Sequence, residues 1–348
     1  MSKLVSAYAY KLPPGRIAQR PAAPRESAKL MVVDRAKDAL RHAHVRDLPE
    51  FLDAGDVVVV NVSKVFNARL KGTFETGGAA ELFLIRPANR QWLAIGKPGK
   101  KLRPGAVVVI ARNFKAKVVK NHGDGTLTVD FGLPDDEVIR LANRHGEIPI
   151  PPYIKKLPKR GEYQTVYARR EGSVAAPTAG FHLTQPLIDG LKKKGVIFAE
   201  VVLHVGLGTF QPIRTKKLEE HRMHAEWVEI PRETVGEILK AKIERRRVIA
   251  VGTTTVRALE GAVERCRRLP AGRQGELCAW HGDVELFIAP GFEFQVVDAL
   301  LTNFHLPKST LLVLVSAFAG RKKILQAYEQ AVKKKYRFYS FGDAMLII

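Results

Sequence analysis

The segment RVIAVGTTTVRALEGAVERC, residues 247–266, predicts the fold class of this chain. The apolar run from Val248 to Val251 is typical of a strand, and after the sequence GTTT a helical pattern continues to Cys266. The segment FQVVDALLTNFHLPKSTLLVLVSAFAG, residues 294–320, repeats this order of strand, loop and helix. Because such alternation is typical of an open α/β sheet, we expect an α/β main domain.

Other segments extend the same pattern. VVVVN at residues 57–61 predicts a strand that is buried on both faces, and KLMVVDR at residues 29–35 predicts another strand. PLIDGLKKKG at residues 186–195 predicts a helix that ends at Gly195, and a strand follows it at residues 196–205. Residues 219–230, EEHRMHAEWVEI, predict a loop before a helix at residues 233–244.

Residues 68–150 show a different pattern. Six short alternating apolar runs, from ARLKGTF at residues 68–74 to LTVDFG at residues 127–132, are separated by turns rather than helices. They predict a small antiparallel β-barrel, followed by a short helix that ends at Gly146. Because strand, loop and helix units flank this region, we expect the barrel to be inserted into a discontinuous α/β domain of residues 1–67 and 151–348.

The charge balance indicates a polyanionic partner. The 348 residues include 57 Lys+Arg and 35 Asp+Glu, which leaves a net charge of +22 at pH 7. The basic residues occur in several segments that are predicted to be folded. Any one of these segments alone is explained as a solvated surface, but all of them together favour a surface that binds RNA by its shape. The candidate RNA contacts are Lys100, Lys101, Arg103, Lys155, Lys156, Arg160 and Lys308.

Composition also limits the class of protein. The apolar run TLLVLVSAFA at residues 310–319 has about half of the roughly 20 residues that a membrane-spanning helix needs, so we expect a buried helix there. No stretch resembles a signal peptide, and we expect a cytoplasmic protein that is a monomer. Cys266 and Cys278 lack the spacing of a zinc site or a disulfide framework, which predicts reduced thiols.

Polar residues follow three predicted strands. Glycines occur in HVGLGTF at residues 204–210, threonines in GTTTVR at residues 252–257, and Asn303 and His305 in LTNFHLPKST at residues 301–310. Ligands of open α/β sheets bind beyond the carboxyl ends of the strands, and the amino end of a helix favours an anion. At least one of the three threonines also serves simply to cap its helix.

The segment GSVAAPTAGFHLT, residues 172–184, has small side chains that bring the backbone close to a neighbour. It reads either as the wall of a ligand site or as a tight structural loop. Its only titratable side chain is His182, which is either a proton-transfer group or a structural imidazole. His221, His224 and Glu226 lack the spacing of a helical zinc motif, so we expect no metal.

Several long motifs resemble, in order and nearly end to end, the S-adenosylmethionine:tRNA ribosyltransferase-isomerase family of the queuosine pathway. They include YKLPPGRIAQRPAAPR, GSVAAPTAG, LHVGLGTFQPI, RVIAVGTTTVR and YRFYSFGDAMLI. The resemblance implies an α/β domain interrupted by a small β-barrel. It also implies transfer of the ribosyl portion of S-adenosylmethionine to 7-aminomethyl-7-deazaguanine at the tRNA wobble position in the anticodon. The implied products are epoxyqueuosine in tRNA, adenine and methionine.

The implied reaction needs a base, an acid and a site for S-adenosylmethionine as co-substrate, with no metal and no prosthetic group. The candidate acid and base residues, with their roles left open, are His182, His204, His305 and Asp298. The candidate binding residues for S-adenosylmethionine are Thr178, Gly180, Gly206, Gly208, Thr209, Thr253, Thr254, Arg257 and Asn303.

The chain departs from the family pattern after the second strand, where Val62 and Lys64 replace an aspartate and an arginine, and no role is carried onto either residue. Two other functions remain open at this point. A methyltransferase that acts on RNA would also bind S-adenosylmethionine, but it would produce S-adenosylhomocysteine. A non-catalytic RNA-binding protein would explain the charge and leave the polar strand ends unexplained.

Overall fold

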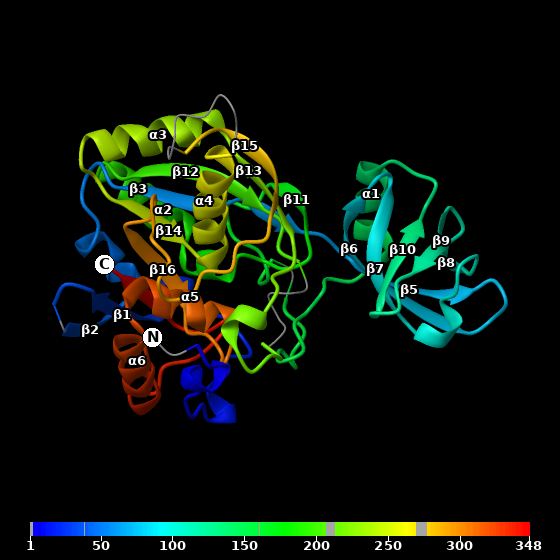
Figure 1. Cartoon of the computed structure of the whole chain (residues 1–348), viewed down its shortest axis with the longest axis horizontal. Coiled ribbons are helices and arrows are strands. Elements are labelled where there is room, and N and C mark those ends of the chain that lie inside the picture. The colour runs from blue at the N-terminus through cyan, green and yellow to red at the C-terminus, as the bar shows by residue number, and fades with distance from the viewer. Residues whose placement is uncertain (1–2, 38, 160, 207–212, 269–276) are drawn as a thin grey trace.

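A computed structural model describes residues 3–37, 39–159, 161–206, 213–268 and 277–348. Figure 1 shows a main body that contains both termini and, beside it, a smaller body built from residues in the middle of the chain. In the described residues, no helix combines the length and the apolar character that crossing a membrane requires.

The main body is built on a nine-stranded sheet with the order β15-β13-β12-β3-β14-β16-β17-β1-β2. Strands β12, β3, β14 and β16 are parallel neighbours, so their carboxyl ends lie at one edge. The strands are β1 (Lys29–Asp34), β2 (Ala39–His44), β3 (Val57–Asn61), β12 (Ile197–Leu203), β13 (Glu226–Ile230), β14 (Val248–Val251), β15 (Trp280–Val284), β16 (Ala299–Asn303) and β17 (Ala344–Ile347).

Helices cover both faces of this sheet, as the buried strand β3 predicts. Val57 and Val59 pack in one apolar cluster with helices α3 to α6, whereas Val58 and Val60 pack on the opposite face with α2. Successive side chains of a strand point to opposite faces, which is why an all-apolar run fits this central position. The helices are α2 (Gln185–Lys193), α3 (Arg232–Ile243), α4 (Thr253–Cys266), α5 (Thr310–Ala319) and α6 (Arg321–Lys333).

The smaller body is a closed barrel with the strand order β10-β7-β6-β5-β8-β9. Its neighbouring strands are antiparallel, and helix α1 (Asp135–His145) packs on its core through Val138 and Leu141. The predicted α/β fold with a small antiparallel barrel is therefore confirmed, while the boundaries at residues 67/68 and 150/151 stay a prediction. The barrel strands are β5 (Arg69–Phe74), β6 (Ala79–Ala88), β7 (Gln91–Lys97), β8 (Val107–Ala111), β9 (Phe114–Asn121) and β10 (Thr126–Asp130).

Two short strands join the barrel to the main body. Strands β4 (Ser63–Val65) and β11 (Arg170–Ser173) pair with each other where the chain leaves and re-enters the main body. An ion pair between Arg86 of β6 and Asp283 of β15, with 3.0 Å between Nη1 and Oδ2, adds a contact between the barrel and the main sheet.

Two predictions from the sequence are wrong. Cys266 and Cys278 form a disulfide with 5.9 Å between their Cα atoms, so they are not reduced thiols. The predicted loop at residues 219–230 contains β13, which is held by antiparallel pairing to β12 and β15. Neither the disulfide nor the pairing of β13 with its neighbours follows from the local sequence pattern, because both depend on where the chain turns back.

Candidate active site

A cleft lies at the carboxyl edge of the parallel strands. It brings together the polar segments that follow these strands, where ligands of open α/β sheets bind. It is lined by part of the small-residue segment, by the first residues of α4 and by the residues that follow β16. The lining residues are Tyr153, Ala175, Ala176, Pro177, Thr178, Ala179, Val205, Gly252, Thr253, Thr254, Thr302, Asn303, His305, Leu311, Tyr339 and Ser340.

The start of α4 contributes a turn of backbone to the cleft. Gly252 precedes the helix with a φ of 91°, a conformation that glycine adopts without strain, and no side chain caps the helix. The hydroxyl of Thr255 donates to Val251 O at 2.8 Å, whereas the buried hydroxyl of Thr254 has no hydrogen-bond partner. The first N–H groups of α4 are therefore not occupied by a capping side chain.

The end of β16 contributes an amide and an imidazole. Asn303 Nδ2 donates to Tyr339 O at 2.9 Å, and the buried Asn303 Oδ1 has no hydrogen-bond partner in the described part of the chain. His305 Nε2 lies 3.1 Å from Thr302 Oγ1, and the backbone N–H of His305 donates to the Tyr328 hydroxyl. Burial lowers the pKa of His305 to about 3, so its ring is neutral near pH 7 and has the form that accepts a proton.

Three lining residues were not predicted from the sequence. Tyr153 and Tyr339 meet edge to face with 4.0 Å between ring centroids, and the Tyr153 hydroxyl lies 2.7 Å from Ser340 Oγ. Burial raises the pKa of both tyrosines, that of Tyr339 to about 12, so both hydroxyls keep their protons near pH 7. Tyr339 also has a φ of 73°, and a bulky residue in that strained conformation is a recognisable feature of functional sites.

His182 lies beside the cleft rather than in it. Its ring lines a small separate hollow with Arg25 and Ser340, and Ser340 also lines the cleft. Burial lowers the pKa of His182 to about 4, and no described residue forms a hydrogen bond with its Nε2. Gly180, close to His182 in the chain, is required by packing, because a Cβ there would lie 2.0 Å from the Tyr167 hydroxyl.

His204 also lies outside the cleft lining. Its ring stacks on Trp227 with 5.2 Å between centroids and 17° between planes, and its Nε2 would lie 2.8 Å from a Cβ added at Gly172. Burial, together with Arg170, lowers the pKa of His204 to about 4. His204, which follows β12, therefore packs between Trp227 of β13 and Gly172 of β11.

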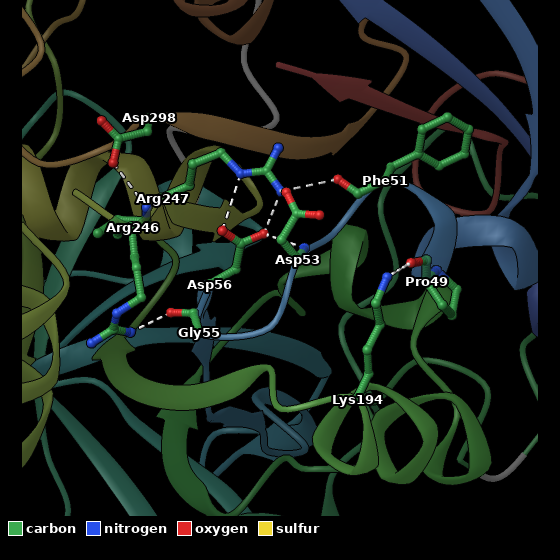
Figure 2. Close-up of polar contacts among 10 residues, drawn as sticks. Pro49, Phe51, Asp53, Gly55, Asp56, Lys194, Arg246, Arg247 and Asp298 are labelled. Carbon is green, nitrogen blue, oxygen red and sulfur yellow. Dashed lines mark hydrogen bonds and ion pairs between the residues drawn. The ribbon is translucent and has the colours of Figure 1, made fainter. Parts of the chain in front are cut away.

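Asp298 does not belong with the other candidates, which corrects its place in the predicted site. It precedes β16 and therefore lies at the amino edge of the sheet, opposite the cleft. Its carboxylate accepts hydrogen bonds from Lys242 Nζ at 2.8 and 2.9 Å and from Val248 N at 2.8 Å. Figure 2 shows it near Arg247, whose side chain contacts Asp53 and Asp56 at the same edge.

Arg257 and Glu226 form a buried ion pair between α4 and the start of β13. Glu226 Oε1 also accepts a hydrogen bond from Gly206 N at 3.0 Å, so Arg257 supports the segment after β12 through Glu226. Arg257 is one of the predicted binding residues for S-adenosylmethionine, and that role stays a prediction. In the structure the Arg257 guanidinium contacts Glu226 and the Leu286 carbonyl, and Arg257 does not line the cleft.

The remaining predicted residues divide into four groups. Thr178, Thr253, Thr254 and Asn303 line the cleft, whereas Gly206 contacts Glu226 beside it. Gly208, Thr209 and Arg160 lie outside the described residues. The predicted RNA contacts that are described are all exposed at the surface, namely Lys100, Lys101, Arg103, Lys155, Lys156 and Lys308.

The two departures from the family pattern have structural explanations. Val62 is buried in the apolar cluster on the α2 face, and Lys64 Nζ forms an ion pair with Glu171 Oε1 at 2.8 Å across β4 and β11. Neither side chain lines the cleft. In the described residues, no group of three His, Cys, Asp or Glu side chains is arranged to hold a metal ion.

Comparison with known proteins identifies the family. A model of a family described as "Queuosine biosynthesis protein" matches residues 5–347. A Thermotoga maritima protein named S-adenosylmethionine:tRNA ribosyltransferase-isomerase is 48% identical over 99% of both chains, and an Aquifex aeolicus protein of the same name is 46% identical over 99% of both. The crystal structure of S-adenosylmethionine tRNA ribosyltransferase from Thermotoga maritima matches 99% of this chain and 100% of that chain, with 40% identity and a TM-score of 0.57. With nearly its whole length matched, this chain belongs to the queuosine biosynthesis protein family.

Proposed function

We propose that this protein transfers the ribosyl portion of S-adenosylmethionine to 7-aminomethyl-7-deazaguanine at the wobble position of tRNA and isomerises it. The product is epoxyqueuosine in tRNA, and adenine and methionine are released. The observation that carries this proposal is the match over almost the whole chain to relatives that are named for this reaction. The cleft supports it, because it lies where α/β sheets bind ligands and combines hydroxyl, amide and imidazole groups.

The roles in the reaction follow from the chemistry of S-adenosylmethionine. Its positive sulfur acidifies the C5′ protons of the ribose, so a base is needed at C5′ and a proton donor for the departing adenine. We assign the base to His305, because among the candidate histidines it alone lines the cleft. The hydroxyls of Tyr153 and Tyr339 are the candidate donors, because both residues line the cleft and a tyrosine hydroxyl is protonated near pH 7.

The exposed basic residues support tRNA as the second substrate. Lys155 and Lys156 follow Tyr153 of the cleft lining, and Lys308 follows His305, so these cations lie close in the chain to the proposed site of chemistry. Phosphate contacts from such side chains position a nucleic acid without reading its sequence. We expect the protein to act on the anticodon region as a cytoplasmic monomer, with S-adenosylmethionine as co-substrate and no metal.

One assay tests the proposal. The protein is incubated with S-adenosylmethionine and tRNA that carries the 7-aminomethyl-7-deazaguanine base, and the small products are separated. Free adenine and methionine in equal amounts are expected. S-adenosylhomocysteine in their place would indicate a methyltransferase, and tRNA binding without either product would indicate a non-catalytic RNA-binding protein.

A further inference from the structure

We propose that the amino end of helix α4 binds the carboxylate of the methionine portion of S-adenosylmethionine, and that Asn303 Oδ1 accepts a hydrogen bond from its ammonium group. This inference rests on the proposed function, because it assigns one part of that substrate to one part of the cleft. Its basis is a helix end that lacks a cap and two buried polar atoms that lack partners.

The two helices that begin at the carboxyl edge after β14 and β16 differ in their caps. Ser309 caps α5, because its hydroxyl accepts a hydrogen bond from Leu312 N at 3.2 Å. Helix α4 has 14 residues, begins after Gly252 and has no side-chain cap and no acidic residue in its first turn. The partial positive charge of its amino end is therefore not compensated by the protein.

The unpartnered atoms lie on different elements and line the same cleft. Thr254 is 8% exposed and Asn303 is 3% exposed, yet among the residues that the structure describes Thr254 Oγ1 and Asn303 Oδ1 have no hydrogen-bond partner. Leaving such groups unpaired when buried destabilises the protein, because their hydrogen bonds to water are lost and not replaced. A ligand that supplies an acceptor to the Thr254 hydroxyl and a donor to Asn303 Oδ1 removes that destabilisation.

The charges of the cleft select the kind of ligand. Among the described lining residues there is no lysine, arginine, aspartate or glutamate, so the end of α4 is its main positive feature and side-chain and backbone oxygens are its acceptors. An α-amino acid, with a carboxylate two bonds from an ammonium group, matches this arrangement. A tRNA phosphate has the same anionic chemistry as the carboxylate, but the burial of Thr253 and Thr254, at 6% and 8% exposed, favours the smaller group.

The test uses inhibitors that differ by a single group. S-adenosylhomocysteine carries both the carboxylate and the ammonium, its decarboxylated analogue lacks the first, and its deaminated analogue lacks the second. Each competes with S-adenosylmethionine in the adenine-release reaction at saturating substrate tRNA. The inhibition constants are measured for the parent, Thr254→Val, Thr254→Ser and the control Ser316→Ala, which removes another buried hydroxyl without a partner.

We expect the parent to bind S-adenosylhomocysteine about 10-fold to 100-fold more tightly than either analogue, the range for hydrogen bonds to charged groups. Thr254→Val should weaken S-adenosylhomocysteine about 10-fold, leave the decarboxylated analogue unchanged and not lower the melting temperature. Thr254→Ser should restore the parent's preference, and Ser316→Ala should retain it.

Three results would overturn the inference without touching the proposed function. These are equal binding of S-adenosylhomocysteine and its decarboxylated analogue by the parent, equal weakening of both by Thr254→Val, or parent-like binding of both by that variant. A raised KM for tRNA in Thr254→Val with unchanged inhibitor preference would assign the helix end to a phosphate. A parent that releases no adenine at all would instead refute the proposed function.

Discussion

His182 and His305 are buried and His204 is half-buried, and desolvation lowers the pKa of all three, yet of these only His305 lines the cleft. A depressed pKa therefore does not identify a catalytic histidine in this molecule, because desolvation alone produces it. Position relative to the cleft separates the three rings. His204 stacks on Trp227, and His182 lies in a neighbouring hollow with Arg25.

Exchanging each histidine for glutamine tests this separation. We predict that His305→Gln lowers single-turnover adenine release by roughly 10²-fold to 10⁴-fold, the usual range for loss of a general acid or base. His182→Gln, the matched control, should lower the melting temperature and keep turnover within a few-fold of the parent. The reverse pattern, with slow His182→Gln and normal His305→Gln, would assign the proton transfer to His182.

The buried histidines also predict how stability depends on pH. The unfolded chain binds protons at its histidines below about pH 6.5, whereas native His305 resists protonation until about pH 3, so the free energy of unfolding should fall as the pH drops below 6.5. At pH 5 the contribution of such a histidine to this loss is about 2 kcal/mol relative to pH 7.

Urea unfolding of the parent and of His305→Gln at pH 7 and pH 5 measures this contribution. The variant should lose less stability between the two pH values than the parent, whatever its stability at pH 7. Equal losses would mean that burial does not keep His305 neutral.

At the scale of elements, the sequence predicted the helices and strands whose conformation is determined by their own residues. VVVVN became β3 with the predicted bounds, and the helix with the GTTT start became α4, because apolar periodicity and a turn are local signals. Strands β13, β15 and β17 depend on pairing between distant segments, and the pattern of EEHRMHAEWVEI does not contain that information.

The sequence also predicted those residues of the candidate site whose position follows from a local signal. Thr253, Thr254, Asn303 and His305 lie at or just beyond the carboxyl ends of β14 and β16, where ligands of open α/β sheets bind, and the structure places them in the cleft lining. Tyr153 and Tyr339 reach the cleft from segments that follow no parallel strand of the sheet, and no local rule brings them there. Asp298 was misplaced because it precedes its strand, which puts it at the opposite edge.

The buried ion pair of Arg257 in α4 and Glu226 in β13 allows a prediction about the stability of the protein. Arg257→Met leaves the Glu226 carboxylate buried without its cation, and we expect a loss of about 3–5 kcal/mol in the free energy of unfolding. The double variant Arg257→Met/Glu226→Gln should recover part of this loss, because a neutral amide keeps an acceptor for Gly206 N.

The control for this experiment is Arg268→Met at the exposed pair with Glu264, whose side chains are 64% and 49% exposed. Its cost should be below about 1 kcal/mol, as for other surface pairs. If the double variant is no more stable than Arg257→Met, the loss comes from packing of the arginine stem rather than from the uncompensated charge. Denaturant unfolding of the four proteins under one condition makes the comparison.

At the scale of the whole molecule, the charge of +22 belongs to a folded surface that includes the barrel. Lys100, Lys101 and Arg103 line one hollow on the barrel, next to Gly77 and Gly105, and all three are exposed. Cations of this kind bind phosphates and release counterions, so their contribution to tRNA affinity must decrease as salt increases.

We predict that tRNA affinity of the parent falls steeply between low and moderate salt, and that replacing Lys100, Lys101 and Arg103 with glutamine weakens binding at low salt. The triple variant should also have a shallower slope of log affinity against log salt, by about one for each phosphate contact that is lost. Filter binding or fluorescence anisotropy over a salt series measures both quantities, with circular dichroism to show that the barrel is folded.

The matched control replaces Lys193, Lys240 and Arg245, three exposed residues near the amino ends of β12 and β14, with glutamine. This change removes the same charge from the edge opposite the cleft. If the barrel binds tRNA, the control retains the parent's affinity and slope while the barrel variant loses both. Equal losses in the two variants would show that the net charge acts as a long-range field without a docking surface on the barrel. Unchanged binding in both would show that the phosphate contacts lie elsewhere, with Lys155, Lys156 and Lys308 close in the chain to the cleft residues as the next to replace.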